Sequence, residues 1–138
     1  MNIVLDTNCL IMSISPRSPY RSVWQSFLCG DYTLCISNEI IEEYAEVMAR
    51  NISPRVSEAI VYSILTRPNV LRVDPHYSFG LITADTDDNK FVDCAIVANA
   101  RCIVSEDKHF NVLKTVAFPK IDVIGINDFM DILGKHLN

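Results

Sequence analysis

The stretch IVLDTN, residues 3–8, places three apolar residues directly before a carboxylate and two small polar residues. The apolar residues 3–5 predict a buried strand, which raises the question of why it stops on Asp6. Such an aspartate is either a turn or helix-capping residue or a charge held where ligands bind, because open α/β sheets bind ligands beyond the carboxyl ends of their strands. The choice depends on which other side chains converge on Asp6.

Short β-branched runs alternate along the chain with segments of helical character. The expected strands are residues 3–5, 34–36, 70–73, 102–104 and 121–126, and the expected helices are residues 22–28, 38–50, 55–66, 91–100, 110–116 and 127–137. This alternation implies right-handed crossovers, a parallel sheet and helices on both faces. The sequence therefore predicts an α/β fold, a three-layer α/β/α sandwich with a short central parallel sheet.

Length and composition favour one domain spanning residues 1–138. No apolar run approaches the roughly 20 residues that span a bilayer, and the N-terminus lacks a secretory pattern, so we expect a cytoplasmic protein without a membrane segment. The five cysteines include no C-x-x-C pair, which supports neither a disulfide framework nor a zinc site. The net charge of -5 argues against nonspecific adhesion to nucleic acid, unless some of the acids bind cations.

Two acids lie on predicted helices. In the segment 38–50, Glu43 leans towards the apolar stripe, whereas Glu39, Glu42 and Glu46 point away from it. A solvated glutamate is an equally acceptable explanation of Glu43. Asp93 is the only charged residue of the apolar run FVDCAIVANA. A buried carboxylate needs a hydrogen bond, an ion pair or a metal, although an aspartate in the first helical turn is also stabilised by the helix dipole.

Asp107 follows the strand at residues 102–104 and precedes a helix, so by itself it resembles an N-cap. Its position nonetheless repeats that of Asp6, since both acids end apolar strands and have a hydroxylic neighbour, Ser105 or Thr7. Two acids at the ends of parallel strands can share one crevice. The DTDDN stretch, residues 85–89, does not fit a calcium loop and is expected to form a solvated loop and helix cap, with Asp88 near the site.

Four acids from two strand ends and two helices suit Mg²⁺ or Mn²⁺, which prefer oxygen ligands. Without metal, such a set of acids would raise one another's pKa values. Two divalent ions can bind the attacking and leaving oxygens of an in-line phosphoryl displacement, and their charge would offset most of the net negative charge. Lys108, His109, Arg17 and Arg21 are further candidates for phosphate contacts, with a solvated surface as the alternative.

Four stretches in this order, IVLDTN, ISNEIIEEYAEVM, DDNKFVDCAIVANA and CIVSEDKHF, resemble the PIN domain family. The resemblance covers nearly the whole chain and is strongest to the VapC-like branch of bacterial toxin components. It implies a parallel sheet with helices on both faces and a metal-dependent nuclease that cleaves single-stranded RNA.

The resemblance also assigns roles to residues and partners. It implies metal ligands at Asp6, Glu43, Asp93 and Asp107, with Asn8 and Ser105 orienting ligands or water. Glu106 stands where this branch often has glycine, and it would add negative charge near the phosphate path. The implied partners are an antitoxin protein and a second copy of the chain in a homodimer or higher homo-oligomer.

Competing classes fit the residues less well. A phospho-accepting receiver domain would need a pair of adjacent acids after the first strand, and a D-x-D phosphatase would need an aspartate where Asn8 stands. The remaining alternative is a catalytically inactive PIN-like module that binds RNA or protein.

Overall fold

The computed structural model describes residues 1–75, 78–82, 86–117 and 119–137. Its described strands form one all-parallel sheet in the order β3-β2-β1-β4-β5. The strands are β1 (Asn2–Leu5), β2 (Thr33–Ile36), β3 (Val70–Arg72), β4 (Cys102–Val104) and β5 (Val123–Ile124). The predicted fold class and all five predicted strands are confirmed, although β5 is shorter than expected.

The helices between the strands match the expected segments with one omission. They are α1 (Thr7–Ile14), α2 (Arg21–Leu28), α3 (Asn38–Asn51), α4 (Pro54–Thr66), α5 (Asn89–Val97) and α6 (Ile126–Leu137), with 3₁₀ helices η1 (Thr86–Asp88) and η2 (Lys108–Thr115). Helix α1 was missed, because a short segment rich in apolar residues gives little helical periodicity. The helix predicted at residues 110–116 is the 3₁₀ helix η2.

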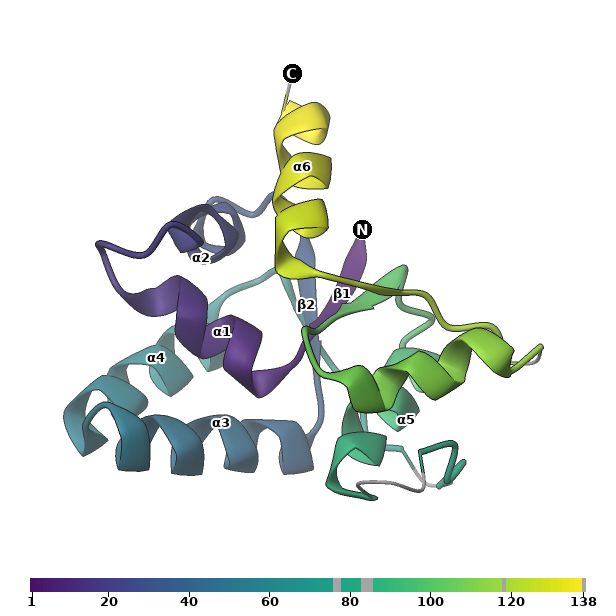
Figure 1. Cartoon of the computed structure of the whole chain (residues 1–138). Helices are drawn as coiled ribbons and strands as arrows, with labels where there is room; N and C mark the ends of the chain where they lie inside the picture. Colours follow the sequence, from purple (N-terminus) through teal and green to yellow (C-terminus); the bar gives the residue numbers. More distant parts are fainter. Residues whose placement is uncertain (76–77, 83–85, 118, 138) are drawn as a thin grey trace.

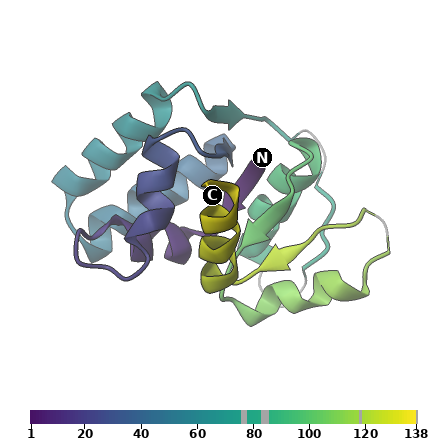
Figure 2. The ribbon, with the colours of Figure 1, turned by 90° about the horizontal axis from the view of Figure 1, so that it is seen from above.

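Helices cover both faces of the sheet. Helix α5 packs against β1, β2 and β4, while α1 contacts α2 and α2 contacts α6. The hairpin of α3 and α4 lies at one side of the molecule, opposite η2 (Figures 1 and 2). These positions give the three layers that the sequence predicts.

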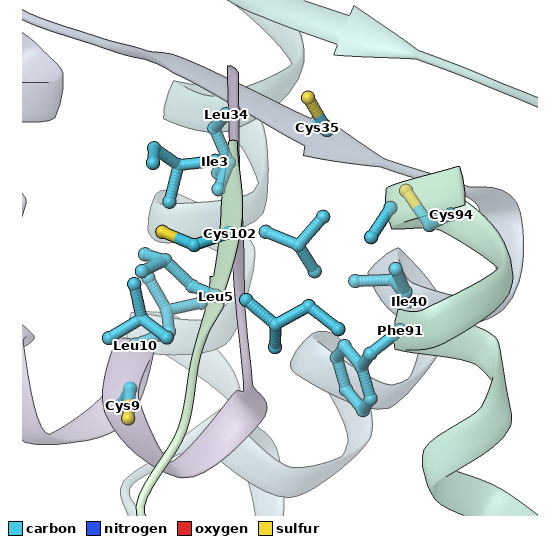
Figure 3. Close-up of a cluster of buried hydrophobic side chains, with 14 of the residues drawn as sticks. Ile3, Leu5, Cys9, Leu10, Leu34, Cys35, Ile40, Phe91, Cys94 and Cys102 are labelled. Atoms are coloured by element: carbon cyan, nitrogen blue, oxygen red, sulfur yellow. The ribbon is translucent and has the colours of Figure 1, made fainter. Parts of the chain in front are cut away.

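The core is built on both sides of the central strands. Ile3 and Leu5 point from β1 towards Leu10 of α1, whereas Ile40 and Phe91 lie on the opposite side (Figure 3). All five side chains are at most 1% exposed. Successive residues of a strand face opposite sides of the sheet, so a central parallel strand is apolar throughout, and the first polar residue after it is placed at the edge.

Two contacts fix the edge of the sheet where β1 and β4 end. Leu5 pairs with Val104 in the parallel ladder, and the Asp6 amide donates to the Val104 carbonyl at 3.0 Å. The buried Tyr44 hydroxyl of α3 donates to the Leu5 carbonyl at 2.5 Å. These contacts bring the residues that follow β1 and β4 to the same edge of the sheet. Glu43, the neighbour of Tyr44 in α3, is brought to that edge as well.

The caps and the cysteines agree with the sequence. The Ser37 and Ser53 hydroxyls accept amide hydrogen bonds at the starts of α3 and α4, and Pro54 begins α4 after the predicted break. All five cysteines are free, as expected; four are buried and Cys29 is exposed. Within the described ranges, no helix has the length and apolar character needed to cross a membrane.

Candidate active site

Asp6 and Asp107 are joined through Ser105. The Ser105 hydroxyl donates to Asp6 Oδ2 at 2.8 Å and accepts a hydrogen bond from the Asp107 amide at 2.9 Å. Asp6 and Ser105 are each 6% exposed. The expectation that the two strand-end acids share one edge of the sheet is therefore met in the structure.

Asp6 occupies the N-cap position of α1, yet its side chain makes no capping hydrogen bond. Asp107 does act as a cap, since its side chain accepts the His109 amide at 2.9 Å at the start of η2. Of the two explanations of a strand-end aspartate, the capping residue thus fits Asp107, and the charge held where ligands bind fits Asp6. The carboxylate of Asp6 is held by Ser105 and the Thr7 amide, whereas that of Asp107 caps the helix.

Glu43 reaches the same edge from α3. Its Oε2 accepts a hydrogen bond from the hydroxyl of Thr7, the residue after Asp6. The Glu43 side chain is 23% exposed, while Glu39, Glu42 and Glu46 are exposed to solvent. The helical-wheel argument for Glu43 is confirmed, and Thr7 is a polar neighbour of the site to which the sequence analysis gave no role.

Asp88 approaches Asp107 through His109. His109 Nδ1 lies 3.2 Å from Asp88 Oδ2 and 3.3 Å from Asp107 Oδ1. Potential ligand atoms of these three residues lie within 4.8 Å of one another. Asp88 is 8% exposed, so the expectation of Asp88 near the site is met. Its side chain does not cap α5.

Asp93 has different neighbours. It lies inside α5 rather than in its first turn, and its Oδ1 accepts the Phe79 amide at 3.1 Å. Burial raises the pKa of Asp93, and the charge of Glu39 adds to this, against hydrogen bonds from Phe79 and Ser78. Asp93 is thus a buried acid as predicted, but its described contacts lead to residues 78–79 and not to Asp6 or Asp107.

Lys90 places a positive charge beside Glu43. Its Nζ lies 2.8 Å from Glu43 Oε1, and its side chain is 14% exposed. Burial lowers the pKa of Lys90, but the hydrogen bond to Glu43 and the charges of Glu43, Asp87 and Glu39 together raise it above its usual value. Lys90 therefore stays charged at neutral pH. No pattern in the sequence pointed to this pair, which joins residues 47 positions apart.

The electrostatics of Asp6 show that the acids interact. Burial raises the pKa of Asp6, the Ser105 hydrogen bond opposes this, and the charges of Asp107 and Glu43 raise it further. Like charges that disfavour one another's ionised forms are stabilised by a bound cation. The carboxylate oxygens at this edge are the donors that Mg²⁺ and Mn²⁺ prefer, so the donor set fits such an ion.

Two clefts adjoin these residues. One, of about 650 Å³, is lined by Ser37, Asn38, Glu39, Asp74, Pro75, Ser78, Gly80, Asp87, Asn89, Lys90 and Asp93. The other, of about 500 Å³, is lined by Glu39, Glu42, Glu43, Glu46, Val47, Arg50, Asp87 and Lys90. Glu39, Asp87 and Lys90 line both clefts and Glu43 lines the second, whereas Asp6 and Asp107 line neither. The edge of the sheet that carries Asp6 and Asp107, called the acidic edge below, therefore lies beside the clefts.

The other candidate residues have no described contact with these acids. Asn8 is exposed in the first turn of α1. Glu106 accepts the Ile126 amide at 2.7 Å, so its carboxylate is directed to the start of α6. Arg21 donates to the Ile14 carbonyl, and Arg17 is exposed. Asp85, the first residue of the DTDDN stretch, lies outside the described residues.

The chain is an α/β protein with a parallel sheet, and acidic side chains gather at the carboxyl ends of its strands, where such folds bind ligands. These acids form a candidate metal site. The family model described as the PIN domain matches residues 2–109 of this chain. The chain therefore belongs to the PIN domain family, as the sequence motifs indicated. Membership supports a hydrolase of the nuclease class. No curated protein matches the chain.

Solved structures of the same fold include two toxin-antitoxin complexes. VapBC2 from Rickettsia felis, bound to a DNA fragment from its promoter, has a TM-score of 0.61 at 16% identity over 91% of this chain and 98% of that chain. DNA-bound VapBC from Salmonella typhimurium has a TM-score of 0.57 at 15% identity over 91% and 98%. The PIN domain endonuclease Utp24 has a TM-score of 0.51 at 15% identity over 90% and 84%. At these identities the likeness shows the fold alone.

Proposed function

We propose that this protein is a Mg²⁺- or Mn²⁺-dependent endoribonuclease that hydrolyses phosphodiester bonds of single-stranded RNA. The observation that supports it most is the hydrogen-bonded connection of Asp6, Ser105 and Asp107 at the edge of the sheet, with Asp88 beside Asp107. Membership of the PIN domain family supports a nuclease. The single-stranded RNA substrate rests on the sequence resemblance.

The contacts favour a ligand set that differs in one member from the sequence prediction. Asp6 and Asp107 are its centre, Asp88 joins them through its approach to Asp107, and Glu43 flanks Asp6 across Thr7. Asp93, the fourth predicted ligand, contacts Phe79 and Ser78 and none of these acids. A divalent ion bound by these acids supplies Lewis-acid activation of a phosphate and a water molecule.

Residues of the chain orient this set. Ser105 holds the Asp6 carboxylate through Oδ2, and the Thr7 amide also bonds to this side chain. The Thr7 hydroxyl donates to Glu43 Oε2, and the Lys90 ammonium pairs with Glu43 Oε1. The His109 side chain is 43% exposed, and its Nδ1 lies within hydrogen-bonding distance of both Asp88 and Asp107. Outer hydrogen bonds of this kind fix the direction of metal ligands. Asn8, in the first turn of α1, is proposed to orient water.

We further propose that the protein is the toxin component of a toxin-antitoxin system and that it acts in the cytoplasm. Its proposed partner is an antitoxin protein. The chain itself is proposed to form a homodimer or a higher homo-oligomer. The two VapBC neighbours, which are toxin-antitoxin complexes, support the antitoxin partner. The alternative function is a catalytically inactive RNA-binding or protein-interaction module, which would need no ion at the acidic edge.

The test is cleavage of a labelled pool of single-stranded RNA by the purified protein in Mg²⁺, in Mn²⁺ and in EDTA. Asp6→Asn controls for contaminating nucleases, and Asp131→Asn, an exposed aspartate of α6, is the matched surface control. Cleavage that requires both metal and Asp6, and that Asp131→Asn retains, supports the proposal. Absence of cleavage in both metals, with no metal binding, favours the inactive module.

A further inference from the structure

His109 brings an imidazole nitrogen to two acids that come from different parts of the chain. Asp107 caps η2 and accepts the His109 amide at 2.9 Å, so the histidine begins its turn beside this carboxylate. Asp88 ends η1, directly before α5, and is 8% exposed. His109 Nδ1 lies 3.2 Å from Asp88 Oδ2 and 3.3 Å from Asp107 Oδ1. One nitrogen is therefore within reach of two carboxylates.

A hydrogen bond from Nδ1 does not account for both of these short distances. An imidazole nitrogen carries at most one proton, so it cannot donate a well-aligned hydrogen bond to two carboxylates at once. A cation that touches all three groups uses the lone pair of the nitrogen and an oxygen of each acid. The contacts of His109 thus fit a ligand better than a hydrogen-bond donor.

The spacing of these groups is close to that of metal ligands. Neighbouring ligand atoms of an octahedral ion at about 2.1 Å lie about 3.0 Å apart. The two distances from Nδ1 are slightly longer than this, and ligand atoms of all three residues lie within 4.8 Å of one another. An ion at this place would also offset the repulsion between the two acids.

A nitrogen ligand distinguishes between divalent ions. Mg²⁺ takes oxygen ligands and keeps several water molecules. Imidazole suits transition ions, and the affinity of a mixed nitrogen and oxygen site rises from Mn²⁺ through Co²⁺ towards Cu²⁺. A histidine beside the two carboxylates therefore shifts the preference of the site away from Mg²⁺.

We propose that His109 binds the metal ion directly through Nδ1, together with Asp88 and Asp107, so that the site takes Mn²⁺ or a later first-row transition ion in preference to Mg²⁺. The inference rests on the proposed function and deepens it, since it names a residue that selects the ion. His109 is then a ligand itself and not only an outer hydrogen-bond partner of the acids.

The test is pulsed electron paramagnetic resonance of the full chain loaded with Mn²⁺, because a directly bound imidazole couples its ¹⁴N nucleus to the ion. The wild-type protein is expected to show this coupling, and His109→Asn is expected to lose it. The chain has three histidines. The double variant His76→Asn/His136→Asn is expected to keep the coupling, as is Asn111→Ala, the control at an exposed residue of η2.

Calorimetric titration measures the preference among ions. Asparagine keeps a side-chain donor for the two acids but removes the ring nitrogen. His109→Asn is therefore expected to lower Mn²⁺ affinity by at least about 10-fold and to change Mg²⁺ affinity by less than about threefold. Equal losses for the two ions in folded His109→Asn would show that His109 only positions the acids, and would overturn its role as a ligand.

The outcomes separate this inference from the proposed function. Mn²⁺ bound to the wild-type protein without ¹⁴N coupling overturns the role of His109 alone. If His109→Asn does not fold by circular dichroism, the wild-type spectrum and the double variant decide, because coupling that disappears in the double variant belongs to another histidine. Failure of the wild-type protein to bind Mn²⁺ overturns the metal dependence itself, whereas ¹⁴N coupling without RNA cleavage overturns the nuclease and supports the metal site.

Discussion

The Ser105 hydroxyl lies 2.8 Å from Asp6 Oδ2, although the two residues are 99 positions apart in the chain. Both are buried directly after paired strands, so the parallel register of β1 and β4 creates this contact. Ser105 also accepts the Asp107 amide, and a single hydroxyl thus sets the relative position of two acids. The orientation of the candidate metal ligands depends on this serine.

Ser105→Ala is expected to weaken Mn²⁺ binding by about 10- to 100-fold, which is typical for the loss of a group that orients a metal ligand. The reason is that Asp6 loses the donor that fixes its carboxylate. Calorimetric titration measures the affinity, with Ser22→Ala at an exposed position of α2 as the matched control. Equal affinities of Ser105→Ala and the wild-type protein would show that Ser105 does not orient a ligand.

The substitutions Asp88→Asn and Asp93→Asn test which of these two acids binds the metal ion together with Asp6 and Asp107. Asp88 lies beside Asp107, whereas Asp93 accepts the Phe79 amide. We therefore expect Asp88→Asn to lower Mn²⁺ affinity by at least about 10-fold and Asp93→Asn to change it by less than about threefold. The reverse order in the same titration would restore Asp93 as the ligand.

Much of the fold could be predicted because its signals are local. The buried central strands are apolar runs, and the capping serines and Pro54 mark where α3 and α4 begin. Helix α1 was missed because TNCLIMSI offers few polar positions to define a face. The sequence also predicted Asp6, Asp107 and Ser105 together, since parallel strands deliver their carboxyl ends to one edge.

Pairings between distant segments could not be predicted in the same way. The partners of Lys90 and Thr7 depend on how α3 and α5 approach β1, which no spacing along the chain encodes. The direction of Asp93 depends on contacts with residues 78–79 in a long irregular stretch. Glu106 was expected near the phosphate path, yet its acceptor role at α6 depends on the position of β5.

Asp6→Asn is expected to stabilise the metal-free protein at about pH 7 and to lose this advantage at about pH 4. The pKa of Asp6 in the folded protein is raised above 3.8, first by burial and then by Asp107 and Glu43. The folded state therefore binds the proton more tightly than the unfolded state, and ionisation of Asp6 lowers stability as pH rises through the folded pKa.

Urea unfolding in EDTA at the two pH values measures this difference, with Asp131→Asn as the control at an exposed site. Asparagine can still accept the Ser105 hydrogen bond, so the comparison isolates the charge. A lower free energy of unfolding for Asp6→Asn than for the wild-type protein at about pH 7 would contradict the raised pKa.

Glu106→Ala is expected to cost about 1 kcal/mol of stability, as the loss of a helix N-terminal acceptor does. Its Oε1 accepts the Ile126 amide, and a methyl group on Gly125 would lie 2.9 Å from that oxygen. Gly125→Ala is therefore expected to displace the carboxylate and to have a smaller effect once Glu106 is alanine.

A double-mutant cycle by urea unfolding measures this coupling, with Glu58→Ala on the exposed face of α4 as the control. Strictly additive effects of the two substitutions would show that Gly125 does not protect the Glu106 contact.

The most direct measurement of the central claim is the rate of single-stranded RNA cleavage across a series of Mn²⁺ concentrations, in the wild-type protein and in Asp107→Asn. The account predicts that the Mn²⁺ concentration for half-maximal rate equals the dissociation constant from titration, that EDTA abolishes cleavage, and that Asp107→Asn loses at least about 100-fold in rate, or roughly 2.7 kcal/mol. Cleavage that persists in EDTA, or at an unchanged rate in Asp107→Asn, would contradict a metal-dependent nuclease at this edge of the sheet.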